Sequence, residues 1–217
     1  MKMETLKKIR LVFPGLVIFF FILLTVSTKN DDELIGFLDM IEGGVQRQTP
    51  YSVILIVFGV LYYAFGCRNL LWKPVINKVN NNITEQLLHV AGYSEKFPLT
   101  DEKGTSLRNS VFYHYIDTDA SLEKKSKSVM INGCLLSCAA DLIIISFSCF
   151  FLLVVKSLLP YGVSSAAYFL CLACLMISVP VFIRLYKKHI ELSNEQLGII
   201  RNKYKDDCSK RVKDIVE

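Results

Sequence analysis

The stretch Ser128–Val155, SVMINGCLLSCAADLIIISFSCFFLLVV, decides the class of this protein. Between Lys127 and Lys156 it carries a single charged side chain, that of Asp141. A bilayer core about 30 Å thick needs roughly 20 apolar residues in a helix. A backbone in lipid must also satisfy its own hydrogen bonds. We therefore expect this stretch to form a membrane-spanning helix.

Three further uncharged windows occur along the chain, at Leu11–Thr28, Gln48–Cys67 and Ser157–Ile183. The first ends in Leu24–Ser27, which is a poor cleavage site, so we interpret it as a span and not as a signal peptide. Apolar residues make up 52% of the sequence. A soluble domain seldom reaches this value, because charged residues must cover its surface. The predicted fold class is all-α: a polytopic integral membrane protein with four transmembrane helices.

The basic residues indicate which ends of the spans face the cytoplasm. Of the 25 Lys and Arg residues, 22 lie in the N-terminus, the loop after the second span and the C-terminal tail, and three lie in the other two loops. Cytoplasmic loops carry this kind of positive excess. We therefore expect a multi-pass protein of the cell (inner) membrane, in contact with membrane lipids and with both termini in the cytoplasm.

This arrangement divides the chain into four segments. Residues 1–67 hold the first two spans and an acidic outside loop, and residues 128–187 hold the third and fourth spans. Residues 68–127 form a cytoplasmic helical loop, and residues 188–217 form a charged, helical cytoplasmic tail. In the outside loop, the apolar spacing over residues 34–41 predicts a short amphipathic helix.

The cytoplasmic loop opens with a helical stripe in which apolar residues recur every three to four positions. They are Leu71, Val75, Val79, Ile83, Leu87 and Val90. This pattern predicts an amphipathic helix over residues 72–90 that is ended by Gly92. Residues 92–110, in contrast, have the composition of turns and loop. Asp119 is expected to cap a helix that opens at Ala120 and continues into the third span.

The cytoplasmic helices carry no catalytic signature, so we interpret them as a docking surface for a cytosolic protein partner. The candidate docking residues are Leu71, Val75, Val79, Ile83, Leu87, Phe112, Tyr115, Leu192 and Ile199. The last two belong to the tail, whose apolar residues are too sparse for a coiled coil. A basic groove with interleaved aromatic residues is missing, so we predict no direct nucleic-acid binding.

No sequence motif for catalysis, metal binding or cofactor binding occurs. His89, His114 and His189 are isolated in the sequence, and there is no phosphate-binding glycine loop or nucleophile elbow. The seven cysteines avoid the outside loops, where disulfides would form. Pairs at helical spacing, such as Cys134 and Cys138, have no further metal ligands nearby. We predict a protein that is not an enzyme and that holds no cofactor or metal.

Asp141 is the one acid inside a predicted span, and it has two interpretations. A carboxylate in hydrocarbon is costly unless it faces a protein interior or a wet cavity, which makes Asp141 a candidate intramembrane functional residue. Alternatively, the span begins near Leu142, Lys156 extends to the opposite interface, and Asp141 lies at the membrane surface. No basic residue inside another span is available as its partner, which disfavours a transporter.

The fourth window contains small residues that favour close helix packing within or between subunits. They are Gly162, Ser164, Ser165, Ala166, Ala167, Cys171, Ala173 and Cys174. We therefore expect a homo-oligomer.

The order of four spans, acidic outside loop and cytoplasmic helices resembles the membrane component of the bacterial Kiwa anti-phage defence system. The segment Phe112–Ser146, FYHYIDTDASLEKKSKSVMINGCLLSCAADLIIIS, is typical of small defence proteins from AT-rich genomes. The resemblance implies a homo-oligomer that senses a disturbance of the membrane during infection and works with a cytosolic DNA-binding partner. It assigns no functional residue to this sequence.

Two functions are consistent with these patterns. In the first, a non-enzymatic membrane sensor or scaffold of an anti-phage complex recruits or regulates a cytosolic partner. In the second, an oligomer forms a pore or channel-like effector that permeabilises the membrane. Asp141 and the small residues of the fourth span would then line the path.

Overall fold

The structure is a computed structural model that describes residues 3–26, 48–93, 99–158 and 165–217. These residues form helices and turns, and no β-strand occurs among them, which confirms the all-α class. Within the described ranges, two helices are long and apolar enough to cross a membrane, α7 (Ala120–Ser157) and α8 (Ser165–Lys203). The outside-loop helix expected at residues 34–41 lies outside the described residues, as do the last two residues of the first predicted span and residues 159–164 of the fourth.

The chain divides into two compact units. Unit 1 comprises Met1–Leu71 and Cys134–Ile183, and unit 2 comprises Trp72–Gly133 and Arg184–Glu217. These divisions lie within a few residues of the predicted segment boundaries at 67, 127 and 187. Helices α7 and α8 each contribute residues to both units.

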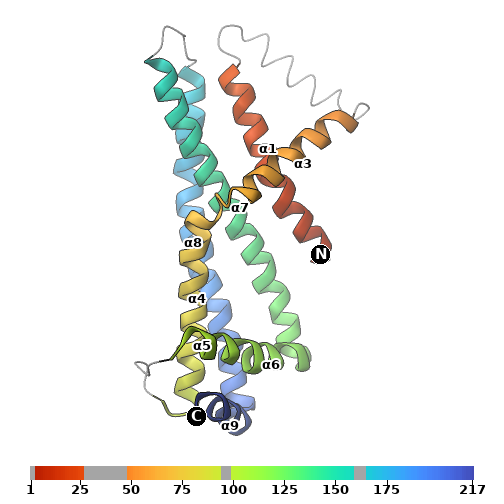
Figure 1. Cartoon of the computed structure of the whole chain (residues 1–217), viewed down its shortest axis with the longest axis vertical. Helices are drawn as coiled ribbons and strands as arrows, with labels where there is room; N and C mark the ends of the chain where they lie inside the picture. The colour runs from red at the N-terminus through yellow and green to blue at the C-terminus, as the bar shows by residue number, and fades with distance from the viewer. Residues whose placement is uncertain (1–2, 27–47, 94–98, 159–164) are drawn as a thin grey trace. The chain divides into compact units, whose positions relative to one another are not determined.

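Unit 1 is built around a close crossing of two helices. They are α1 (Met3–Val26) and α3 (Gln48–Ala64), seen crossing in Figure 1. A Cβ added to Gly15 would lie 1.9 Å from the carbonyl oxygen of Leu55, and one added to Gly59 would lie 2.2 Å from the carbonyl oxygen of Leu11. Both distances are far inside van der Waals contact. The two glycines therefore let the helix backbones approach each other directly.

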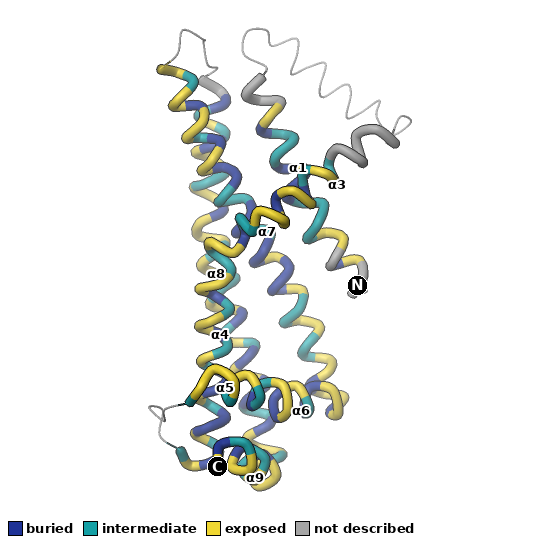
Figure 2. Tube along the Cα trace, in the orientation of Figure 1, coloured by how far each residue is buried: buried dark blue, intermediate teal, exposed yellow. Residues whose placement is uncertain are grey.

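The apolar core of unit 1 joins α1 and α3 to α7 and α8. Its buried members are Val17, Phe21, Tyr62, Ile145, Cys149, Leu153, Ala167 and Cys171. Outside this core, many residues of α7 and α8 are exposed (Figure 2). Large apolar residues are among them: Phe169 and Met176 of α8 are 72% and 75% exposed, and Leu158, which follows α7, is 81% exposed. Exposed apolar side chains in this number are unfavourable in water and suit contact with lipid or with another protein.

Unit 2 is a helical bundle with its own apolar core. Its elements are α4 (Asn69–Val90), α5 (Asp101–Leu107), the π-helix η2 (Arg108–Phe112), α6 (Tyr113–Thr118), the first part of α7, the last part of α8 and α9 (Lys205–Val216). The predicted stripe on α4 is confirmed, because Val75, Val79, Ile83 and Leu87 are all buried. The helix ends at Val90. Gly92 follows with a φ of +86°, a left-handed conformation that commonly ends helices.

The loop predicted over residues 92–110 is wrong for its second half, which is helical. Thr100 caps α5, and its hydroxyl oxygen accepts a hydrogen bond from the backbone N–H of Lys103 at 3.4 Å. Leu107 and Val111 are fully buried in the core of unit 2. This burial outweighs the turn-forming composition of the segment, because tertiary contacts routinely override local propensity.

In unit 2, Asp119 connects the start of α7 to the end of α8. As predicted, it caps α7: its Oδ1 accepts hydrogen bonds from the backbone N–H of Ser121 at 2.8 Å and of Leu122 at 3.3 Å. Its Oδ2 accepts from Lys203 Nζ at 2.5 Å and from the Tyr204 hydroxyl at 2.7 Å. Hydrogen bonds from Lys203, Ser121 and Tyr204 hold the pKa of the Asp119 carboxyl well below its usual range.

Replacing Gly59 by Ala is expected to destabilise unit 1. The new Cβ meets the carbonyl oxygen of Leu11, and forced overpacking costs about 1–3 kcal/mol. Gly198→Ala is the matched control. Nothing lies within 4 Å of a Cβ at that helical position, so the control should gain up to about 1 kcal/mol of helix stability. The free energy of unfolding in detergent micelles, followed by circular dichroism, checks both. Equal effects of the two substitutions would contradict the close crossing.

The charge on Asp119 is expected to stabilise unit 2 except at low pH. Because the folded-state pKa is lowered, the contribution is complete above about pH 4, the ordinary range for Asp, and is lost as the pH falls through the folded-state value. Asn also caps helices well, so Asp119→Asn isolates the charge. The variant should be less stable than the wild type at pH 7, and the difference should shrink below about pH 4. Asp117→Asn, at an exposed position two residues before Asp119, is the matched control and should change the free energy of unfolding at pH 7 by less than about 0.5 kcal/mol.

Candidate functional site

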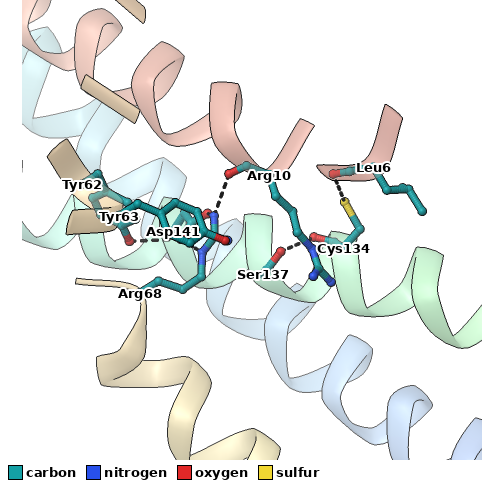
Figure 3. A network of polar contacts seen from close by, with 8 residues as sticks. All are labelled: Leu6, Arg10, Tyr62, Tyr63, Arg68, Cys134, Ser137 and Asp141. Carbon is teal, nitrogen blue, oxygen red and sulfur yellow. Dashed lines mark hydrogen bonds and ion pairs between the residues drawn. The ribbon is translucent and has the colours of Figure 1, made fainter. Parts of the chain in front are cut away.

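The centre of unit 1 holds a buried ion pair between Asp141 of α7 and Arg68 (Figure 3). The Asp141 side chain is completely enclosed by the protein. Arg68 Nε donates to Asp141 Oδ1 at 2.8 Å, and Arg68 Nη2 makes a second, shorter contact with Oδ2. The hydroxyl of Tyr62 donates to Oδ1 at 3.0 Å. Both carboxylate oxygens are therefore engaged.

Arg68 gathers partners from three parts of unit 1. Its Nη1 donates to the hydroxyl of Tyr63 on α3 at 2.6 Å, and its guanidinium carbon lies 4.6 Å from the centre of that ring. Its Nη2 also donates to the backbone carbonyl of Arg10 on α1 at 2.9 Å. A single side chain thus connects α1, α3 and α7.

A tight turn between α3 and α4 aims Arg68 at this site. The backbone N–H of Gly66 donates to the carbonyl of Tyr63 at 3.0 Å, and that of Asn69 donates to the carbonyl of Gly66 at 2.9 Å. Gly66 has a φ of +64°, in the left-handed region that favours glycine. Helix α3 therefore ends at Ala64, the chain bends at this turn, and α4 starts directly after Arg68.

The ion pair is held by the geometry that a buried charge requires. Transferring either ion alone into a low-dielectric interior costs several kcal/mol, and only close pairing with further hydrogen bonds offsets that cost. The two-pronged contact of guanidinium with carboxylate is the strongest form of such pairing. Tyr62 and the Arg10 carbonyl satisfy further positions on the two ions. The pair is electrically neutral as a unit and acts as an internal clamp.

Asp141 has a basic partner although no other predicted span contains a basic residue, because Arg68 lies one position beyond the predicted window at residues 48–67. Because Arg68 directly follows an uncharged window, the sequence predicts that it begins the cytoplasmic loop, where basic residues normally fix topology. The two residues are 73 positions apart in the chain. The signal available in the sequence is a combination of two features: a lone acid inside one predicted span, and an arginine close to a glycine at the end of another predicted window.

The predicted docking residues lie largely in the core of unit 2. The residues that are buried there are Val75, Val79, Ile83, Leu87, Phe112 and Tyr115. Leu71 and Leu192 are half-buried, and Ile199 packs against the core cluster. The hydroxyl of Tyr115 donates to Asp207 of α9 at 2.7 Å. In the folded unit these side chains contact the chain itself, so a docking surface has to be sought among exposed residues.

An apolar groove of about 230 Å³ lies beside the ion pair in unit 1. Its walls come from α1, α3 with the turn that follows it, and α7. They include Ile18, Phe21, Tyr62, Ile145, Ser148 and Cys149. Tyr62 belongs both to the groove wall and to the hydrogen bonds around Asp141.

Among the described residues, no three His, Cys, Asp or Glu side chains come together as a metal site would require. All seven cysteines are free thiols. Burial raises the pKa of the Cys208 thiol in unit 2 to about 11, so its reactive thiolate form is scarcely populated at neutral pH. The described groups at the centre of unit 1 thus clamp helices together and leave no charged oxygen of Asp141 unengaged.

No protein-family model, curated protein or solved structure matches this chain.

Breaking the ion pair from one side is expected to cost about 3–5 kcal/mol of unfolding free energy, because the other charge stays buried without its partner. We expect this loss for Arg68→Met and for Asp141→Leu. The double variant, with no charge left to bury, should lose clearly less than the sum of the two.

The matched control is the exposed pair Lys125–Glu195 of unit 2, whose side chains are 41% and 47% exposed. A double-mutant cycle on that pair should show little coupling, because water screens it. Unfolding titrations in detergent measure both cycles. Additive effects at Arg68 and Asp141 would rule out the clamp.

Proposed function

We propose that this protein is a non-enzymatic membrane sensor or scaffold that recruits or regulates a cytosolic partner. The observation that supports this most directly is a contrast between the surfaces of the two units. Of 26 large apolar side chains that are exposed in the described part of the chain, 24 belong to unit 1, and only Tyr113 and Ile131 belong to unit 2. One unit is suited to lipid and the other to water.

In the proposed arrangement, the chain crosses the cell (inner) membrane four times with both termini in the cytoplasm. The lengths and apolar character of α7 and α8 support two of the spans. The windows at residues 11–28 and 48–67 and the 22-to-three distribution of basic residues support the other two and the orientation. Unit 2 then lies in the cytoplasm.

The ion pair is the proposed sensing element. Arg68 immediately precedes α4, and α4 continues as a core helix of unit 2. A disturbance of the membrane that separates Arg68 from Asp141 would release the start of α4 from α7. Two arrangements of this kind, biased by the state of the bilayer, are the physical basis of a switch.

The resemblance to the Kiwa membrane component gives the proposal a biological setting. On that basis the disturbance is a phage infection, the protein acts as a homo-oligomer, and the cytosolic partner is a DNA-binding effector. The partner would supply the chemistry, and this chain would supply location and control.

A pore-forming oligomer is less well supported by the site. Asp141 is enclosed and paired with Arg68, and Ala167 and Cys171 of the small-residue face pack in the core of unit 1. Groups that line an aqueous path would instead be available to water within an assembly. Dye leakage from cells at high expression, reduced by Asp141→Leu, would favour the pore over the scaffold.

The scaffold predicts a partner contact on the exposed surface of unit 2. Tyr113 is 46% exposed on α6, and Tyr is among the residues that dominate interface energies. Tyr113→Ala is expected to lower recovery of the cytosolic partner by about tenfold in crosslinked affinity purification from native membranes.

Phe169→Ala, on the exposed surface of α8 in unit 1, is the matched control and should leave recovery unchanged. Removal of α9 is unsuitable for this test, because Cys208, Val212 and Val216 are part of the core of unit 2. Recovery of no cytosolic protein with the wild-type chain would refute the scaffold.

A further inference from the structure

We propose that the groove beside the ion pair binds one acyl chain of a bilayer phospholipid. The inference rests on the membrane location proposed above and adds a ligand to it. The groove lies entirely within unit 1, between α1, α3 with its following turn, and α7. Helix α7 is one of the two that are long and apolar enough to cross a membrane.

The groove has apolar walls and an open rim. Phe21, Tyr62 and Cys149 in its walls are 3%, 6% and 6% exposed. At the rim, Ile22 and Leu152 are 39% and 62% exposed and belong to the apolar outer surface of α1 and α7. The groove is therefore continuous with the surface that meets lipid, and an acyl chain enters it without crossing a polar barrier.

The size of the groove selects among occupants. A volume of about 230 Å³ accepts a flexible hydrocarbon chain, whereas a helix of a second copy is about 10 Å wide with its side chains and does not fit. Water is also a poor occupant, because a bound water needs two to four polar partners. The described lining offers few polar groups, mainly the Ser148 hydroxyl and the thiols of Cys67 and Cys149.

Occupancy of the groove bears directly on the ion pair. Tyr62 forms part of the wall, and its hydroxyl donates to Asp141 at 3.0 Å. An acyl chain packed against the ring holds the tyrosine in the position that completes the clamp. Loss of the chain, when the bilayer is thinned or disordered, frees the ring and removes one hydrogen bond from the carboxylate. The groove would thus translate lipid packing into the state of Arg68 and Asp141.

Photolabelling with a defined lipid tests the proposal. The full-length chain is reconstituted into vesicles that contain phosphatidylglycerol with a diazirine in the middle of one acyl chain. It is then solubilised in dodecyl maltoside, washed to remove loosely held lipid, and irradiated. Label is expected on the peptides of the groove, around Ser148 and Tyr62, and not on the exposed surface around Met176.

Ser148→Phe places an aromatic ring in the groove. It should lower this labelling by about tenfold, because the acyl chain then has no room to bind. Ile18→Phe fills it from α1 and should do the same, which guards against a folding defect in either variant. Ala173→Phe, an exposed position on α8 that does not line the groove, should label like the wild type.

Wild-type protein that retains no label in the groove would overturn the proposal, and so would undiminished labelling of both filled variants. Label elsewhere on the chain, or crosslinks from Cys149 to residues 27–47, would equally count against a lipid occupant. The outcome is independent of partner recovery. Groove labelling without a cytosolic partner would leave the lipid site standing while the scaffold falls, and partner recovery without labelling would do the reverse.

Discussion

The pairing of Arg68 with Asp141 is the constraint on which the rest of unit 1 depends. A carboxylate enclosed within an apolar helix pair needs a counter-charge in contact, because the interior cannot solvate it. That requirement fixes where α3 must end, since Arg68 has to reach α7 from the turn that follows Ala64. The same requirement explains the left-handed conformation of Gly66. It also explains the two tyrosines before it, since Tyr62 is hydrogen-bonded to Asp141 and Tyr63 to Arg68.

The crossing of α1 and α3 belongs to the same arrangement. Gly59 allows the backbone of α1 to approach at Leu11. The adjacent carbonyl, that of Arg10, accepts a hydrogen bond from Arg68. A bulkier residue at position 59 would push α1 away and leave a guanidinium N–H without an acceptor in a place where water is scarce. The glycines at the helix crossing and the ion pair therefore depend on each other, because the close approach of α1 brings the Arg10 carbonyl within reach of Arg68.

Features encoded by neighbouring residues could be predicted from the sequence, and features encoded by distant residues could not. The stripe on α4 and the cap at Asp119 depend on spacing within a few residues, and the structure confirms both. The partner of Asp141 lies 73 positions away. Periodicity predicts that Val79 and Leu87 are buried, but it does not say which residues bury them. The docking interpretation therefore falls on residues that form unit 2's own core. The short helix α5 escaped prediction because the burial of Leu107 decides it, against its composition.

The groove and the clamp share Tyr62, and this sharing gives the proposed sensor a physical threshold. Each group alone responds weakly: an acyl chain gains little by packing against one ring, and the carboxylate keeps its arginine if the tyrosine moves. In the proposed sensor the two are coupled through Tyr62, because movement of its ring changes the hydrogen bonds that offset the desolvation cost of the Arg68–Asp141 pair. In this proposal, a change in lipid packing would act on Arg68 through Tyr62. Arg68 directly precedes α4, and α4 contributes residues to the core of unit 2. A movement of Arg68 would therefore reach α4 first.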